Sequence, residues 1–190
     1  MRYTPVNIIR QHQNFVAIRD VGGSTVTYDI YARDPDTYTF WFCGKVASVT
    51  DVSCEMAISR QFPLIEEHAI RLRPLELFSK RGFLQLWYAL GDSELDVAYN
   101  RPTIRFNPVT RPSQYDKEWM KTKTIQVGFQ GEVYNRGEEG FRTLRNEDGT
   151  PMKAEIIQPT EKRAPTDEEM AQISELIKGK DMQQLFNNKQ

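Results

Sequence analysis

The sequence contains few of the residues from which small catalytic and metal sites are usually built. Of its 190 residues, two are cysteines and two are histidines. Cys43 and Cys54 exclude a disulfide-rich scaffold and a four-cysteine zinc site, so we expect both as free thiols. His12 and His68 leave few geometries for a general base or a metal site. We therefore expect no catalytic residue, no metal and no cofactor.

Excess charge and long apolar runs are also missing. The chain has 25 basic and 26 acidic residues and a formal net charge of −1, so it lacks the field that attracts nucleic acid or anionic lipid. No segment approaches the ~20 apolar residues of a membrane span, and residues 1–12 contain no signal-peptide stretch. We expect a soluble protein of the cytoplasm, or of the stroma if it comes from a plastid. Peripheral association with a membrane complex stays open.

The composition that is present, with 39% hydrophobic and 27% charged residues, is typical of a globular protein. Residues 1–100 predict an α+β core domain. Runs rich in β-branched and aromatic residues predict strands, and three- and four-residue spacing of apolar residues predicts a helix. The predicted strands are 15–21, 26–33, 38–49, 83–88 and 95–99, and the predicted helix is 53–72. This β-β-β-α-β-β order indicates an antiparallel sheet of about five strands with the helix on one face.

The third predicted strand contains four consecutive apolar residues, Phe40 to Cys43. Successive side chains of a strand point to opposite faces, so this strand should be an interior one with Trp41 in the core. The same aromatic residues, beside Lys45, could instead form a base-stacking platform for RNA. The near-neutral charge of the chain favours core packing.

Beyond residue 100 the character of the chain changes. Residues 101–158 form a proline-punctuated extension in which the turn signal 146–149 predicts a hairpin between 140–145 and 152–157, added at the edge of the sheet. Residues 159–190 form a linker and a C-terminal amphipathic helix, which begins at a capping box made by Thr166 and Glu169.

Two groups of residues are candidates for contacts with a partner. Basic residues outnumber acidic ones in 101–123, and the last helix has an apolar stripe. Such helices often dock in a groove of another protein. The predicted partner-binding residues are Arg101, Arg105, Arg111, Lys121 and Lys123 in the first group and Met170, Ile173 and Ile177 in the second.

The predicted helix also supplies the alternative to a binding role. Glu66, Glu67 and His68 lie together in its second half, where they could serve a small enzyme or a ligand-binding domain with a pocket between helix and sheet. Ser93 is a poor candidate nucleophile, because no histidine follows it in the sequence and a hydroxyl needs an aligned base.

Three blocks of sequence, Trp41–Ser48, Arg60–Pro74 and Gly91–Asn100, resemble a little-characterised soluble protein family of cyanobacteria and chloroplasts. The resemblance covers about residues 38–100. It implies an accessory protein that helps to assemble or regulate a photosynthetic complex, and it provides no catalytic residues to carry over. Together with the C-terminal arm, it favours a non-enzymatic protein-binding factor over an enzyme, and an RNA-binding platform is the weakest of the three readings.

Overall fold

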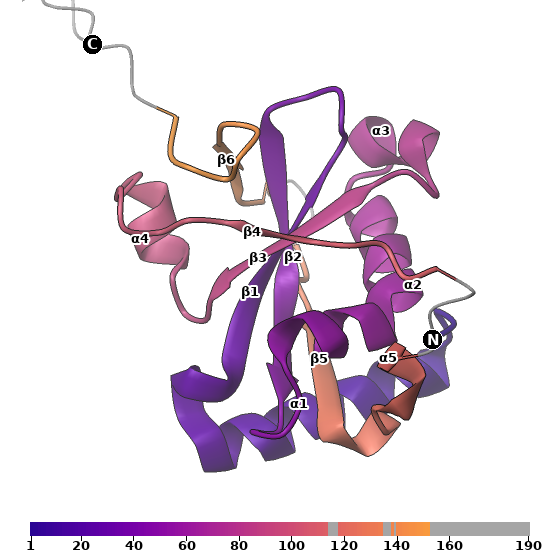
Figure 1. Ribbon diagram of the computed structural model, residues 1–190. Helices are drawn as coiled ribbons and strands as arrows, with labels where there is room; N and C mark the ends of the chain where they lie inside the picture. The colour runs from indigo at the N-terminus through magenta and orange to yellow at the C-terminus, as the bar shows by residue number, and fades with distance from the viewer. Residues whose placement is uncertain (114–117, 135–137, 139, 153–190) are drawn as a thin grey trace, which may run out of the picture. The chain divides into compact units, whose positions relative to one another are not determined.

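The computed structural model describes residues 1–113, 118–134, 138 and 140–152 (Figure 1). By its internal contacts the chain divides into two units, Met1–Lys153 and Ala154–Gln190, and all the described residues belong to the first. That unit has the predicted α+β class, with helices packed on an open antiparallel sheet. The predicted C-terminal helix, with Met170, Ile173 and Ile177, lies outside the described residues.

The sheet has six strands. Its order is β4-β3-β1-β2-β5, with β6 paired to β2 as well, and every pair is antiparallel. The strands are β1 (Thr27–Arg33), β2 (Thr39–Ser48), β3 (Gln85–Leu90), β4 (Asn107–Val109), β5 (Val127–Gly131) and β6 (Arg142–Leu144). The helices are α1 (Pro5–Gly22), α2 (Cys54–Leu72), α3 (Pro74–Leu77), α4 (Glu94–Ala98) and α5 (Glu118–Lys121), with short 3-10 turns η1 (Gly23–Val26), η2 (Phe78–Lys80) and η3 (Thr124–Gln126).

Strand β2 is an interior strand, as predicted. A β-bulge divides it into two parts, which pair with different strands along the same edge. Ile30 of β1 lies opposite Gly44 and Tyr31 lies opposite Phe42, so Cys43 is the extra residue. Gly44 has φ 129°, and a Cβ there would lie 2.1 Å from the carbonyl oxygen of Gln130. The bulge therefore requires glycine. On one side of it β2 pairs with β5, and on the other it pairs with β6.

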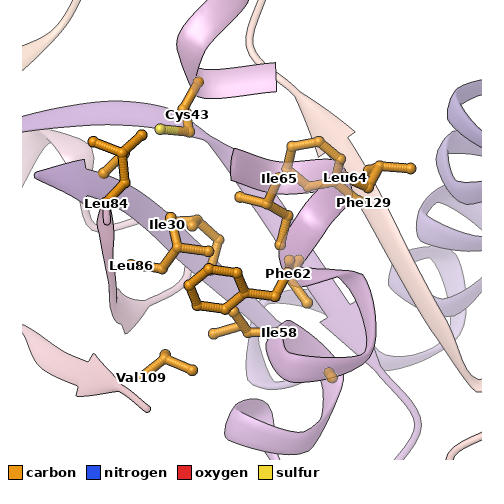
Figure 2. Packing of buried hydrophobic residues seen from close by; sticks show 14 of the residues in the cluster. Ile30, Cys43, Ile58, Phe62, Leu64, Ile65, Leu84, Leu86, Val109 and Phe129 are labelled. Carbon is orange, nitrogen blue, oxygen red and sulfur yellow. The ribbon is translucent and has the colours of Figure 1, made fainter. Parts of the chain in front are cut away.

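Alternate residues of the same strands enter two cores, one on each face of the sheet. On one face, Ile30, Trp41 and Leu86 pack with α2, and Figure 2 shows this cluster. On the other face, Tyr31, Phe40, Phe42, Trp87 and Ala89 pack with Val97 and Phe106. Trp41 is only 7% exposed, which confirms its predicted place in the core. The aromatic strand is thus not available for stacking bases.

Helix α2 matches the predicted helix 53–72 closely. The Ser53 side chain accepts a hydrogen bond from the backbone N–H of Met56 and so caps the first turn. Pro63 lies inside the helix, which continues through it as one element. Pro74 lies two residues beyond Leu72, the last residue of the helix. The inward face contains Ile58, Phe62 and Ile65, at three- and four-residue spacing.

The first predicted strand, 15–21, is wrong, because these residues belong to α1. Thr4 caps this helix by accepting a hydrogen bond from Asn7 N–H, and Pro5 occupies its first turn. Tertiary contacts then override the β-branched composition: Asn14 donates to the carbonyl oxygens of Thr124 and Val127, at 2.8 and 3.1 Å. The helix packs along β5, with the Phe15 side chain buried.

The predicted strand 95–99 is also wrong. Residues Glu94–Ala98 form the short helix α4, which contains acidic residues in its first turn. Its Val97 side chain is buried in the second core, whereas Leu95 and Tyr99 are exposed. Strand β3 pairs with β1 and β4 instead of a hairpin partner.

Residues 101–152 complete the sheet that residues 27–90 begin. They supply β4, β5 and β6, and the predicted edge addition is confirmed for Arg142–Leu144. The predicted turn 146–149 forms, with Asn146 and Thr150 joined by a backbone hydrogen bond, while most of the predicted return strand 152–157 lies outside the described residues. Phe106 is fully buried and stacks on Tyr31 with 4.1 Å between ring centroids.

This packing makes Phe106 a test of whether the segment after residue 100 belongs to the folded core. Phe106→Ala should lower the free energy of unfolding by about 3–5 kcal/mol, because it removes a fully buried ring. Urea denaturation measures the loss. Phe83→Ala is the matched control, because its ring is 74% exposed, and it should cost less than about 0.5 kcal/mol. Equal small losses for the two variants would contradict the assignment.

Candidate docking site

A short segment between α2 and β3 exposes three large apolar side chains. We call residues 74–83 the ledge; it comprises α3, η2 and the turn that follows. Leu75, Phe78 and Phe83 are 93%, 59% and 74% exposed. Only Leu77 of this segment is buried, in the core beneath α2. Exposed apolar residues are common singly, but three within nine residues make this segment a candidate binding surface.

The backbone of the ledge is held by a carboxylate of α2. Glu66 Oε1 accepts a hydrogen bond from the Gly82 N–H at 3.0 Å. Arg111 binds the same carboxylate through both of its terminal nitrogens, at 2.6 and 3.0 Å, and also donates to the Leu84 carbonyl oxygen at 2.9 Å. Gly82 has φ 85°, which favours glycine at this turn. The Glu66 carboxylate is therefore shared by the ledge and by the segment after β4.

Ion pairs tie the polar residues of the ledge to the rest of the protein. Lys80 pairs with Asp36 and, at 3.6 Å, with Asp34 in the β1–β2 loop. Arg81 pairs with Glu67 of α2. The hydrogen bond from Arg81 is the main cause that holds the pKa of Glu67 below its ordinary value; burial opposes it, and the Arg81 charge and Arg71 add to the lowering. Lys80 and Arg81 of the ledge thus pair with the rest of the protein, whereas Leu75, Phe78 and Phe83 are exposed to solvent.

A small cavity of about 240 Å³ lies beside the start of the ledge, lined by Trp41, Arg73, Glu76 and Arg142. Arg73 is the residue after α2, and its guanidinium lies between two rings, 4.5 Å from the centroid of Trp41 and 4.8 Å from that of Tyr134. The β2–β6 register places Arg142 opposite Trp41. Its guanidinium lies 5.5 Å from the centre of the Trp41 ring.

Most of the predicted basic residues in 101–123 have acidic partners. Arg101 pairs with Asp96 at 3.1 Å, Arg105 with Asp148 at 3.9 Å, and Lys121 with Glu118 at 2.7 Å. Arg111 is half-buried in its pair with Glu66, where it stabilises the fold. The Lys123 side chain is exposed beside η3. These residues come from separate elements, and the ion pairs neutralise much of the local positive charge.

The groups considered for catalysis are engaged in contacts within the protein. His68 Nε2 lies 2.9 Å from the Glu132 carbonyl oxygen, Nδ1 lies 3.4 Å from the Tyr3 hydroxyl, and the ring packs edge-on against Phe129. Both cysteines are buried free thiols, as predicted, and burial raises the pKa of Cys43 to about 12. Within the ranges that the structure describes, no group of three potential metal ligands occurs.

Ser93 belongs to a polar cluster that joins the start of α4 to the sheet. The buried carboxylate of Asp29 accepts hydrogen bonds from the Ser93 N–H at 2.8 Å and from its hydroxyl at 3.0 Å. Lys45 lies 2.6 Å from both Asp92 and Glu94. Burial opposes the charge of Lys45, but these hydrogen bonds outweigh it and raise its pKa. A cationic lysine is not a base for Ser93, so the cluster holds the turn in place.

Neither the ledge nor Arg73 was predicted from the sequence as part of a site. A signal was present, since the run from Pro74 to Phe83 combines a helix stop with Leu75, Phe78 and Phe83 outside any periodic pattern. Among the described residues, none of the helices combines the length and apolar character that crossing a membrane requires. Comparisons of the chain with known protein families, with curated proteins and with solved structures gave no match.

The pair between Arg111 and Glu66 can be tested by a double-mutant cycle. Arg111→Gln should lower the free energy of unfolding by about 1–3 kcal/mol, because it leaves a buried carboxylate without its charged donor. The loss should be smaller when Glu66→Gln is already present, since no charge then needs compensation. Arg101→Gln is the control, because its pair with Asp96 is exposed and should contribute less than about 1 kcal/mol. Equal effects in both backgrounds would contradict the assignment.

The buried His68 predicts a loss of stability in mild acid. Burial lowers its pKa from the ordinary 6.5, and the nearby Arg71 charge adds to this, against the hydrogen bond to Glu132. Below pH 6.5 the unfolded chain therefore binds a proton that the folded chain does not, so stability falls as the pH falls. His68→Gln should flatten the dependence between pH 7 and 5.5, measured by urea denaturation. An unchanged slope in His68→Gln would refute the assignment.

Proposed function

We propose that this protein is a non-enzymatic accessory factor that binds another protein through the ledge. The observation that carries the proposal is the exposure of Leu75, Phe78 and Phe83 on a segment whose backbone and charged groups are held by the rest of the fold. Such a surface can bind with little loss of conformational entropy, because its position is set before the partner arrives. Aromatic residues in that setting are typical anchors of protein interfaces.

The shape of the surface favours a macromolecular partner over a small molecule. Small-molecule sites are concave and enclose most of the ligand, whereas the three apolar side chains of the ledge extend into solvent. The residues of the alternative enzyme reading already have partners within the protein. Glu66 pairs with Arg111, Glu67 pairs with Arg81, and the His68 ring lies within hydrogen-bonding distance of the Glu132 carbonyl oxygen. That engagement supports a structural role for all three.

The resemblance of residues 38–100 to a family of cyanobacteria and chloroplasts suggests the biological setting. We propose that the partner is a component of a photosynthetic complex, which the protein helps to assemble or regulate. Apart from Pro74, the ledge lies between two of the blocks that carry the resemblance, Arg60–Pro74 and Gly91–Asn100. The predicted C-terminal helix with Met170, Ile173 and Ile177 would add a second contact to the same partner.

Site-specific photocrosslinking tests this function. A benzophenone amino acid replaces Phe83 in the full chain, which is irradiated in a native extract of the source organism. The control places the same group at Ile9, which is 58% exposed on α1. We expect a single predominant adduct with another protein from position 83 and none from position 9. Adducts in equal amounts from both positions, or an adduct with RNA, would contradict the proposal.

A variant pair then tests whether the apolar side chains provide the affinity. Leu75→Ser with Phe78→Ser should reduce the adduct at least tenfold, because loss of interface anchors typically costs about 2 kcal/mol or more. Val6→Ser with Ile9→Ser removes two exposed apolar side chains from α1 and should leave the adduct unchanged. Both pairs should keep the melting temperature of the parent. A ledge variant that crosslinks as well as the parent would refute the docking site.

A further inference from the structure

One of the arginines that line the cavity beside the ledge has two nitrogens that lack an acceptor. Nε and Nη2 of Arg73 are shielded from solvent and have no hydrogen-bond partner. The rings of Trp41 and Tyr134 lie against the guanidinium, with their centroids 4.5 and 4.8 Å from its central carbon. Unsatisfied buried donors are rare in folded proteins, and a charged one is costly unless an anion accompanies it.

A second uncompensated arginine lines the same cavity. Arg142 is exposed, and no ion pair joins it to any residue that the structure describes. Glu76 also lines the cavity, but no ion pair links it to Arg73 or Arg142. Two guanidiniums on one Trp41 ring repel each other. An anion placed between them would relieve that repulsion and supply acceptors to both.

We propose that this cavity binds a carboxylate, namely an acidic side chain of the partner that docks on the ledge. The inference rests on the proposed function, and it specifies the chemistry of the partner. Its segment would present an aspartate or glutamate to Arg73 and Arg142 and apolar side chains to Leu75, Phe78 and Phe83. The continuity of the chain supports the pairing, because Arg73 directly precedes the ledge and Glu76 belongs to it.

The charge and size of the cavity favour a carboxylate over a phosphate or a nucleotide. Two arginines and one glutamate give the lining a net charge of +1, which a monoanion balances, whereas a phosphate dianion would be opposed by Glu76. The cavity, about 240 Å³, is smaller than the roughly 300–1,000 Å³ of typical small-molecule sites. A planar guanidinium fork also matches a planar carboxylate.

Titration of the purified full chain with small anions tests the site without the partner. Sodium acetate is the probe, sodium chloride at equal ionic strength is the blank, and sodium phosphate tests the rival anion. The signals are the indole N–H of Trp41 and the Nε–H of Arg73 in nitrogen-15 NMR spectra. We expect saturable shifts of both signals with acetate. Linear shifts equal to those in chloride, or saturation by phosphate alone, would overturn the carboxylate site.

Substitutions assign the effect to the cavity. Arg142→Gln should weaken acetate binding at least fivefold while leaving the melting temperature unchanged, because its side chain is exposed. Arg101→Gln removes an exposed arginine of another element and should leave the titration unchanged. Unaltered acetate binding in Arg142→Gln would contradict the proposal. Since no partner is needed, a failed titration beside successful crosslinking at Phe83 refutes the carboxylate site alone, and the reverse result refutes the ledge alone.

Discussion

The position of the ledge depends on the buried carboxylate of Glu66. It joins α2 to a turn 16 residues further along the chain and to an arginine 45 residues further along. A buried carboxylate is costly unless its oxygens accept hydrogen bonds, and here the donors are the Gly82 N–H and the Arg111 guanidinium. Displacing the turn would leave that carboxylate poorly satisfied. The contact thus fixes the backbone while contributing nothing to the outer surface.

This constraint explains how an apolar surface can be both exposed and ordered. Lys80, Arg81 and Gly82 direct their polar groups to Asp36, Glu67 and Glu66, while the neighbouring Phe78 and Phe83 are exposed. Exposing them carries a risk of nonspecific association. A docking role gives the arrangement a function. The arginine cavity at the start of the ledge adds a charged contact, which supplies specificity that apolar contacts lack.

Local patterns in the sequence predicted much of the sheet and its main helix. Strands β1 and β2 and helix α2 were predicted because their period and capping residues agree with their burial, as for Ser53 and Ile58. Helix α1 was missed because the β-branched run in 15–21 outweighed Thr4 and Pro5, a start signal placed ten residues earlier. Helix α4 is so short that the alternation of its apolar residues resembles a strand.

The candidate site could be predicted less well, because its contacts join residues that are distant in sequence. Arg111 was predicted to bind a partner and Glu66 to serve a pocket, yet they bind each other. Charge in a segment does not reveal which carboxylate the fold brings near. Arg73 and Arg142 line one cavity because both lie beside Trp41 of β2, and for Arg142 this depends on the β2–β6 register. Exposure of Phe78 and Phe83 likewise follows from tertiary contacts of their neighbours.

The most direct test of a preformed ledge is hydrogen exchange at the Gly82 amide in the isolated protein. If Glu66 holds the turn before any partner binds, this amide should exchange at least about a hundredfold more slowly than in an unstructured peptide. Arg111→Gln should remove most of that protection, whereas Arg101→Gln should not. Exchange of the Gly82 amide at the unstructured rate in the parent protein would contradict the account.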